Sequence, residues 1–214
     1  MKLGIPVYEG VNLLDVAGPL EMFTWVGASH SLETVIISEN GEPVTSINNV
    51  RFEAHASFAS TPKLDVVWVP GGDPQALVRE GASPDTPYLS YLRQVAQDAQ
   101  WVCSVCEGAL LLARAGLLDG HKATTHWAFV ECLRAFPAIE VTAGAQHRFV
   151  VSGNRLTGGG ISAGLDEALK LIELLFGKSA AERAQTTTEY FPAPPISAQF
   201  PARSPRCGLA WPDR

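Results

Sequence analysis

The chain has 214 residues, of which 46% are hydrophobic, a size and composition that suit one compact domain. Its formal net charge of −6 and sequence pI near 5.3 exclude a general binder of nucleic acids or anionic membranes, because such proteins present a basic surface. No apolar stretch approaches the roughly 20 residues that span a bilayer, and the N-terminus lacks the apolar core of a signal peptide, so we expect a cytoplasmic protein with no membrane partner.

Stretches typical of strands alternate with stretches typical of helices. The expected strands cover residues 2–7, 31–38, 64–69, 101–105, 139–142, 149–152 and 156–157, with a short piece around Thr124. The expected helices cover residues 15–26, 86–99, 107–118, 127–136 and 162–176, and residues 41–60 predict a small antiparallel excursion. This alternation predicts an α/β protein with a doubly wound, mostly parallel sheet and helices on both faces.

A proline-rich tail follows the last of these elements. Prolines recur at positions 192, 194, 195, 201, 205 and 212, and proline neither donates a backbone hydrogen bond nor fits a helix interior. We therefore expect a single α/β domain over residues 1–190, followed by a tail over residues 191–214 that either wraps the surface or is loose.

Residues 101–110 (WVCSVCEGAL) predict a strand that ends at a cysteine and turns at once into a helix. Such a turn aims the Cys106 sulfur at the start of the helix, where unpaired N–H groups and the helix dipole favour a thiolate and can hold an oxyanion. α/β-Hydrolases present a catalytic serine with the same geometry. Cys106 is therefore a candidate nucleophile, and the alternative is a core cysteine, because free cysteine is among the most buried residue types.

The other cysteines do not predict a second site. Cys103 and Cys106 form a C-x-x-C pair, but Cys103 falls inside the expected strand and should point into the core rather than join a redox dithiol. A zinc site would need two more ligands at short spacing, and neither His121 nor His126 is followed by such a pair. Four cysteines are also too few and too scattered for a disulfide framework in a chain of this length. We expect no metal and no cofactor.

Several chemically suggestive residues come directly after strands. Asp15 follows the first strand and its loop, Gly71 and Gly72 follow the third strand, and the glycines at 158–160 follow a late strand. Ligands in open α/β sheets bind at the carboxyl ends of the strands, and glycine turns let the backbone approach a substrate closely. These residues predict a substrate site at that edge, although turn formation alone also explains the glycines. No G-x-G-x-x-G follows the first strand, which argues against a dinucleotide site.

Taken together, these motifs resemble the DJ-1/PfpI superfamily. The matching stretches, in the family's order, are residues 5–21, 69–72, 104–109, 123–127 and 157–168. The resemblance implies a flavodoxin-like (class I glutamine amidotransferase-like) sandwich with a nucleophile elbow, and a homodimer. Within the superfamily the chain is most similar to the isonitrile hydratase branch, which implies hydration of an isonitrile to an N-substituted formamide without a cofactor.

The resemblance also implies roles for particular residues. It makes Cys106 the nucleophile and Asp15 the neighbouring acid/base. The implied substrate and oxyanion pocket contains Gly71, Gly72, Gly108, His126, Trp127 and Ile161. One position departs from the branch, because the residue after the nucleophile is usually threonine and here is Glu107. Glu107 either acts as a catalytic carboxyl that titrates together with Asp15, or it faces solvent and has no part in the chemistry.

Two other functions stay open at this stage. A glyoxalase III-like or deglycase-like enzyme would use the same thiol on α-oxoaldehydes, with His126 or Glu107 moving a proton. A sensor without turnover would need an exposed Cys106 of low pKa that stops at the sulfinic acid. Superfamily members that regulate transcription carry a helix-turn-helix region after this domain, and the proline-rich tail offers none, so we expect no nucleic-acid partner.

Overall fold

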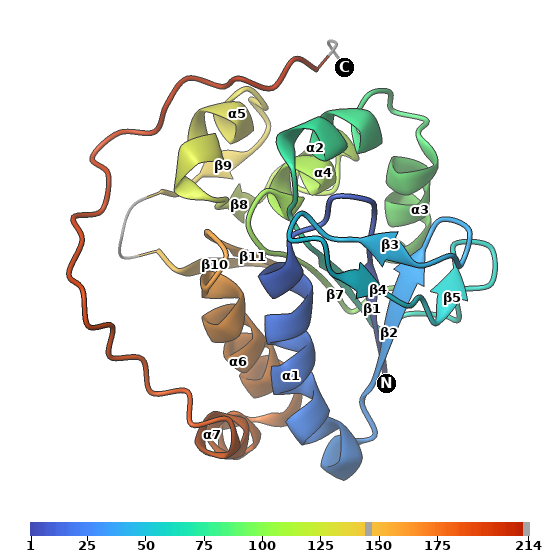
Figure 1. The fold of residues 1–214 in the computed structure, drawn as a ribbon, viewed down its shortest axis with the longest axis vertical. Coiled ribbons are helices and arrows are strands. Elements are labelled where there is room, and N and C mark those ends of the chain that lie inside the picture. Colours follow the sequence, from blue (N-terminus) through green and yellow to red (C-terminus); the bar gives the residue numbers. More distant parts are fainter. Residues whose placement is uncertain (144–146, 212–214) are drawn as a thin grey trace.

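A seven-stranded, mostly parallel sheet forms the centre of the molecule (Figure 1). The computed structural model describes residues 1–143 and 147–211. The sheet has the strand order β10-β11-β7-β6-β1-β2-β5, and β10 pairs with β11 in the antiparallel sense while the other neighbours are parallel. The strands are β1 (Lys2–Pro6), β2 (Glu33–Ser38), β5 (Ala56–Ser57), β6 (Val66–Val69), β7 (Trp101–Ser104), β10 (Phe149–Ser152) and β11 (Arg155–Gly158). The chain adds strands on both sides of β1, so the carboxyl ends of β1 and β6 flank the switch point where ligands bind in such sheets.

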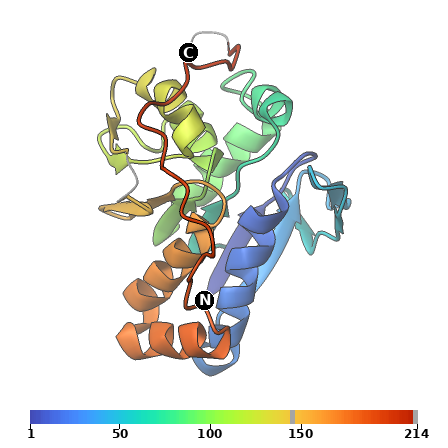
Figure 2. The same cartoon turned by 60° about the vertical axis from the view of Figure 1, so that its left-hand side comes forward.

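Helices cover both faces of the sheet (Figures 1 and 2). The helices α1 (Leu13–His30), α6 (Ala163–Phe176) and α7 (Lys178–Thr187) pack against one another on one face. On the other face lie α2 (Pro74–Glu80), α3 (Pro87–Ala96) and α4 (Gly108–Arg114), and α5 (Val130–Arg134) contacts α4. The predicted α/β class and doubly wound, mostly parallel sheet are confirmed. Among the described residues, no helix has the length and apolar character needed to cross a membrane.

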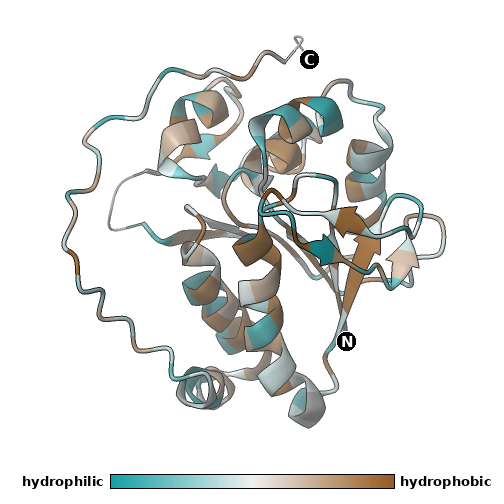
Figure 3. Cartoon of the chain, in the orientation of Figure 1, coloured by the Kyte–Doolittle hydropathy of each residue, from teal (hydrophilic) through white to brown (hydrophobic). Residues whose placement is uncertain are grey.

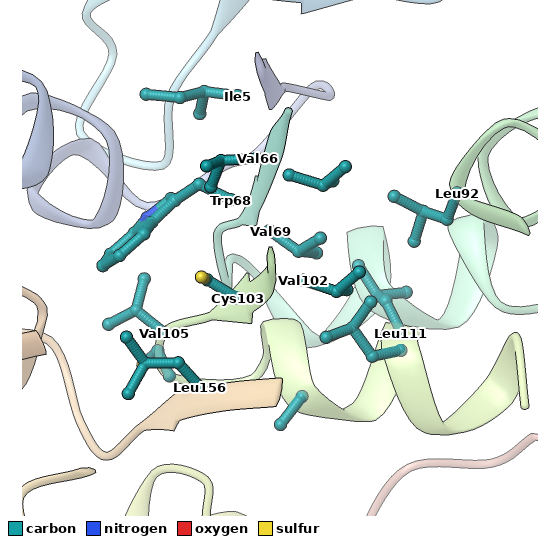
Figure 4. Close-up of a cluster of buried hydrophobic side chains, with 14 of the residues drawn as sticks. Ile5, Val66, Trp68, Val69, Leu92, Val102, Cys103, Val105, Leu111 and Leu156 are labelled. Carbon is teal, nitrogen blue, oxygen red and sulfur yellow. The ribbon is translucent and has the colours of Figure 1, made fainter. Parts of the chain in front are cut away.

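The core lies on both faces of the central strands, which accounts for their continuously apolar sequences (Figure 3). Trp68 of β6 is fully buried, its indole N–H donates to the backbone oxygen of Asp15 at 3.1 Å, and its ring meets Phe23 of α1 edge-on. Cys103 pairs in register with Trp68 on one side and Leu156 on the other, and it is fully buried (Figure 4). The expectation that Cys103 points into the core is confirmed.

Local capping sets the ends of the first and fourth helices. α1 begins before the expected residue 15, because the Asn12 side chain accepts a hydrogen bond from the N–H of Leu14 at 3.3 Å and caps the helix there. α4 stops at Arg114 instead of residue 118, since Gly116 has φ +76 and leaves the helical region. The expected helix 127–136 is divided into a 3-10 turn, Trp127–Phe129, followed by α5.

Two helices were not predicted. α2 carries a recognisable start, with Asp73 accepting the Gln75 N–H at 2.8 Å and Pro74 in the first turn, so the capping signal was present in the sequence and was missed. α7 is polar along most of its length and buries only Ala180 and Ala184 among its described side chains. An apolar stripe of two alanines is too small to produce a clear helical period.

The excursion at residues 41–60 is partly as expected. β3 (Val44–Thr45) and β4 (Arg51–Phe52) form the small antiparallel pair, but β5 instead joins the edge of the main sheet parallel to β2. A second small pair, β8 (Lys122–Ala123) with β9 (Glu140–Val141), takes up the strand-like pieces around Thr124 and residues 139–142.

The C-terminal tail wraps the outside of the molecule, from α7 past α5 and toward α2 (Figures 1 and 2). Residues 212–214 of the expected tail lie outside the described residues. The course of the tail brings Cys207 to Cys132 of α5, 75 positions earlier, and the two form a disulfide. The cysteines were expected to be too few and too scattered for a disulfide framework, and this single bond, which makes no framework, was not predicted. Sequence separation did not reveal the pairing, because it depends on the path of a tail without regular structure.

Candidate active site

Cys106 occupies a sharp turn between β7 and α4. Its φ is +56, a left-handed backbone conformation that is uncommon for a residue with a side chain. Such strained conformations cluster at active sites and ligand-binding sites. Hydrogen bonds fix the turn on both sides: the Cys106 N–H donates to Gly159 O at 2.9 Å, and the Thr125 hydroxyl donates to Cys106 O at 2.8 Å. The Gly108 N–H donates to Val105 O at 3.0 Å and closes the turn. This is the nucleophile elbow that the sequence predicted.

The elbow depends on the absence of a side chain at Gly108. A Cβ added there would press on the carbonyl oxygen of Val69 in β6, a backbone atom that cannot move without displacing the strand. We expect Gly108→Ala to lower the free energy of unfolding by about 3 kcal/mol, measured by urea denaturation. The matched control is Gly159→Ala, whose added Cβ would lie 3.5 Å from its nearest neighbour and should cost less than about 1 kcal/mol. Equal losses in the two variants would contradict this account of the turn.

Three ionisable side chains meet at the elbow. Asp15, in the first turn of α1, and Glu107, next to Cys106, each place a carboxylate oxygen near the Cys106 sulfur, and the three atoms lie within 4.8 Å of one another. All three residues are buried. One Asp15 oxygen accepts the Gly71 N–H at 2.9 Å, and the other has no hydrogen-bond partner in the described structure. The structure thus brings together the three residues expected to carry the chemistry.

Burial keeps protons on this group. Burial and, next, the charge of Glu107 raise the pKa of Asp15 to about 8. Burial and then the charges of Asp15 and Glu107 raise the pKa of the Cys106 thiol well above its ordinary value. At neutral pH the site therefore holds a protonated Asp15 beside a neutral thiol. The condition that the sensor hypothesis requires, an exposed Cys106 of low pKa, is not met, because Cys106 is 1% exposed and two carboxyl groups oppose its charge.

Glu107 does not face solvent. Its side chain is 8% exposed, and one of its oxygens lies 3.8 Å from His126 Nδ1. The same His126 nitrogen accepts the Ala128 N–H at 3.2 Å. Burial lowers the pKa of His126, while the charge of Glu107 acts in the opposite sense, so the imidazole is neutral at pH 7 and the contact is not an ion pair. The departure from threonine therefore places a carboxyl inside the site.

Two of the glycines expected in the pocket have their amides already engaged. The Gly71 N–H is bound to Asp15, and the Gly108 N–H is bound inside the elbow. These two N–H groups position the acid and the turn, so they are not the donors of an oxyanion hole. Gly72 pairs with Val11 in an isolated bridge and lies against Tyr8, where an added Cβ would be 2.9 Å from the tyrosine oxygen.

A cavity of about 690 Å³ opens beside the elbow. Trp127, His126 and Ile161 line it, together with the backbone of Gly159 and Gly160. Trp127 is 37% exposed and Ile161 is 39% exposed, and Ile161 has φ +24, an unusual backbone conformation for a β-branched residue. The Ile161 backbone also contacts the Cys106 thiol. Three of the expected pocket residues therefore line the cavity, and two of them, His126 and Ile161, also contact Glu107 and Cys106 of the elbow.

Comparison with known proteins identifies the family of the chain. The model of the DJ-1/PfpI family matches residues 1–174. The chain belongs to this family. It is 36% identical over 205 residues to isonitrile hydratase of Pseudomonas putida, and the match covers 96% of the chain and 85% of that enzyme.

Two further proteins resemble the chain, one in structure and one over part of its own length. The crystal structure of a THiJ/PfpI family protein from Pseudomonas syringae superposes with a TM-score of 0.84 at 33% identity, covering 95% of this chain and 81% of that one. The HTH-type transcriptional regulator CdhR of Pseudomonas aeruginosa is 30% identical over 149 residues, which cover 68% of this chain and 41% of the regulator. The relatives thus include an enzyme and a transcriptional regulator.

The site of this DJ-1/PfpI chain contains three residues that sequence reasoning did not single out. The Thr125 hydroxyl holds the elbow through its hydrogen bond to the Cys106 carbonyl. Burial, and to a smaller extent the charges of Tyr88, Glu107 and Asp15, raise the pKa of Tyr8. Glu167 of α6 is fully buried, and its carboxyl packs against Gly158. A signal for Glu167 was available, because it lies on the buried stripe of α6 three residues after Gly164 and four before Leu171.

The trio at the elbow is also the one group of described side chains close enough to hold a metal ion. Metal ligands must lose their protons on binding, whereas burial keeps protons on Asp15 and Cys106. A hard cation would prefer oxygen ligands, and a soft one would prefer more sulfur or imidazole than this trio offers. The chemistry of the group fits proton transfer next to a nucleophile better than metal binding.

Proposed function

We propose that the protein is a cofactor-independent isonitrile hydratase, which adds water to an isonitrile and releases an N-substituted formamide. The observation that carries the proposal is the protonated Asp15 carboxyl beside the Cys106 thiol. An isonitrile carbon needs a proton and a nucleophile at the same atom, and this pair supplies both. The 36% identity to an isonitrile hydratase supports the same reaction.

The chemistry proceeds in three balanced steps. Asp15 gives its proton to the terminal carbon of the isonitrile as the Cys106 sulfur bonds to that carbon, and the thiol proton passes to the Asp15 carboxylate, leaving a thioimidate. Water then adds to the thioimidate carbon, and its proton reaches nitrogen through Asp15. Finally the tetrahedral intermediate expels sulfur, the hydroxyl proton returns to the thiolate, and the formamide leaves. Glu107, within hydrogen-bonding reach of the thiol, can relay the sulfur proton.

Purified protein incubated with cyclohexyl isocyanide should form N-cyclohexylformamide, detected by mass spectrometry. We expect turnover in buffer treated with a metal chelator as well as in untreated buffer, because every step uses side chains of the chain itself. A folded protein that forms no formamide at any pH between 6 and 8 would exclude the proposed reaction.

A second enzymatic function is supported by one contact. The 3.8 Å approach of Glu107 to His126 places a carboxyl and a neutral imidazole beside the thiol, and a glyoxalase III-like or deglycase-like reaction on α-oxoaldehydes needs such a base to move a proton between carbons. Methylglyoxal assayed in the same preparation separates the two functions. Lactate formation faster than formamide formation would favour the aldehyde chemistry.

We also propose a homodimer in the cytoplasm. The match to the DJ-1/PfpI family supports the dimer, and Trp25 on α1, which is 54% exposed, offers a large aromatic side chain of the kind enriched at interfaces. Light scattering of the purified protein measures the dimer directly.

The Cys132–Cys207 disulfide is evidence against a cytoplasmic location, because persistent disulfides are typical of oxidising compartments. Fractionation of cells that produce the protein would test the cytoplasmic location, and recovery in an exported fraction would contradict it.

A further inference from the structure

The C-terminal tail forms one wall of the cavity beside the nucleophile. The lining contributed by the tail is residues 200–204, and Phe200 supplies its one aromatic ring. The opposite wall contains Ile161, whose backbone contacts the Cys106 thiol. Cys106 itself does not line the cavity, so a substituent on a carbon bonded to Cys106 would enter it past Ile161 and then run toward the tail.

Fixed points near the cavity hold the tail in place. The Ser204 hydroxyl donates to Trp127 O at 2.6 Å, and three residues later Cys207 is bonded to Cys132 of α5. Further on, the Trp211 indole donates to Leu77 O at 3.2 Å, and the Arg114 guanidinium lies 5.6 Å from the centre of its ring. Residues 192–203 make no hydrogen bond in the described structure. The wall is therefore positioned from its C-terminal side, where the disulfide is the covalent tie.

The composition of the cavity indicates what fits there. Apolar side chains of Leu14, Trp127, Val130, Ile161 and Phe200 line much of it. Two of the three lining arginines are paired with carboxylates, Arg134 with Glu131 and Arg148 with Asp166, while Arg203 of the tail has no ion pair among the described residues. A volume near 690 Å³ falls in the range that encloses a drug-sized ligand and far exceeds the needs of a methyl group.

We propose that the tail is a specificity-determining part of the site: residues 200–204, tied down by the Cys132–Cys207 disulfide, favour isonitriles with a large apolar N-substituent. This inference rests on the proposed hydratase function and names its substrate class. A large substituent reaches Phe200, so only substrates with such a substituent contact its ring. A small isonitrile reacts at Cys106 without touching the tail.

The test compares naphthyl isocyanide with methyl isocyanide in the full-length protein. We expect Phe200→Ala, and separately the Cys132→Ser/Cys207→Ser double variant, to lower kcat/KM for the naphthyl substrate about tenfold, the usual effect of losing part of a hydrophobic contact, and to leave the methyl substrate unchanged. The double variant avoids leaving an unpaired thiol. Ile196→Ala is the matched control, because this tail residue is 75% exposed and does not line the cavity.

A second readout does not depend on turnover. Alkylation of Cys106 by iodoacetamide and by its naphthyl-substituted analogue, followed by peptide mass, should show the same loss of preference for the bulky reagent in the two test variants. If the wild type hydrates neither isonitrile, but it prefers the bulky reagent and the two variants lose this preference, the hydratase function is excluded. The tail would still be a wall that selects what reaches Cys106. Unchanged selectivity in both assays, in variants with native circular dichroism, would overturn the inference. An intact mass showing that Cys132 and Cys207 are not bonded in the wild-type protein would overturn it as well.

Discussion

Replacing Cys106 by alanine is expected to lower kcat/KM for cyclohexyl isocyanide by at least a factor of about 1,000, to the background rate. The sulfur forms the covalent bond to the isonitrile carbon and acts together with the Asp15 acid. Because such residues work as one unit, removal of the sulfur should abolish most of the catalysis. The fold should survive, because alanine keeps the backbone of the elbow and the carbonyl of residue 106 can still accept the Thr125 hydroxyl. Formamide production under single-turnover conditions gives the measurement.

Cys103→Ala is the matched control for this variant. Cys103 lies in β7, three residues earlier, and is fully buried in the core (Figure 4). Its loss should reduce stability slightly and leave kcat/KM within about threefold of wild type, as expected for a core substitution away from the chemistry. If Cys103→Ala and Cys106→Ala lost activity equally, the thiols would act as a pair, and the assignment of Cys106 as sole nucleophile would be wrong.

Much of this site was predictable because it depends on strand ends. Cys106, Asp15 and Gly71 follow β7, β1 and β6, and parallel neighbouring strands bring their carboxyl ends to one edge whatever the loops do. The elbow could be predicted for a similar reason, since an apolar strand running directly into a helical pattern leaves room for only a tight turn.

The protonation of the site could not be predicted in the same way. A helix start favours a thiolate in isolation, but the Cys106 sulfur lies between two buried carboxyl groups, and their charges and the burial dominate its pKa. The direction in which Glu107 points also depends on tertiary packing: it is enclosed between Gly71 and His126, residues from separate parts of the chain. Tertiary packing likewise decides the Cys132–Cys207 disulfide, because no local pattern specifies the path of a proline-rich tail.

Asp15→Asn is expected to make the protein more stable and far less active. Asparagine cannot donate the proton that the isonitrile carbon needs, so kcat/KM should fall by about 100-fold or more. The wild-type kcat/KM should itself decline above pH 8, where Asp15 loses its proton, and the residual activity of the variant should lack this decline. Removing the negative charge that forms on Asp15 should also shift the alkylation of Cys106 toward lower pH, because that charge is one cause of its raised pKa.

The stability change has a definite sign and pH window. The pKa of Asp15 is about 8 in the folded protein and about 4 in the unfolded chain, so the folded state binds this proton more tightly. The free energy of unfolding of the wild type therefore falls as pH rises from about 4 to about 8. Below pH 4 the aspartate and asparagine proteins should be similarly stable. Above it the variant should gain about 1.4 kcal/mol per pH unit, reaching roughly 4 kcal/mol at pH 7. Asparagine retains the oxygen that accepts the Gly71 N–H, so no hydrogen bond offsets the gain.

Urea denaturation of both proteins at pH 5, 6, 7 and 8 measures this difference. Asp98→Asn is the control, because the Asp98 side chain is 69% exposed and its pairing with Lys63 at 3.7 Å is on the surface, where such pairs contribute little. A stability difference for Asp15→Asn that did not grow with pH would mean that Asp15 is ionised in the folded protein. The proton for the isonitrile carbon would then have to come from Glu107, and Glu107→Gln would become the variant that abolishes turnover.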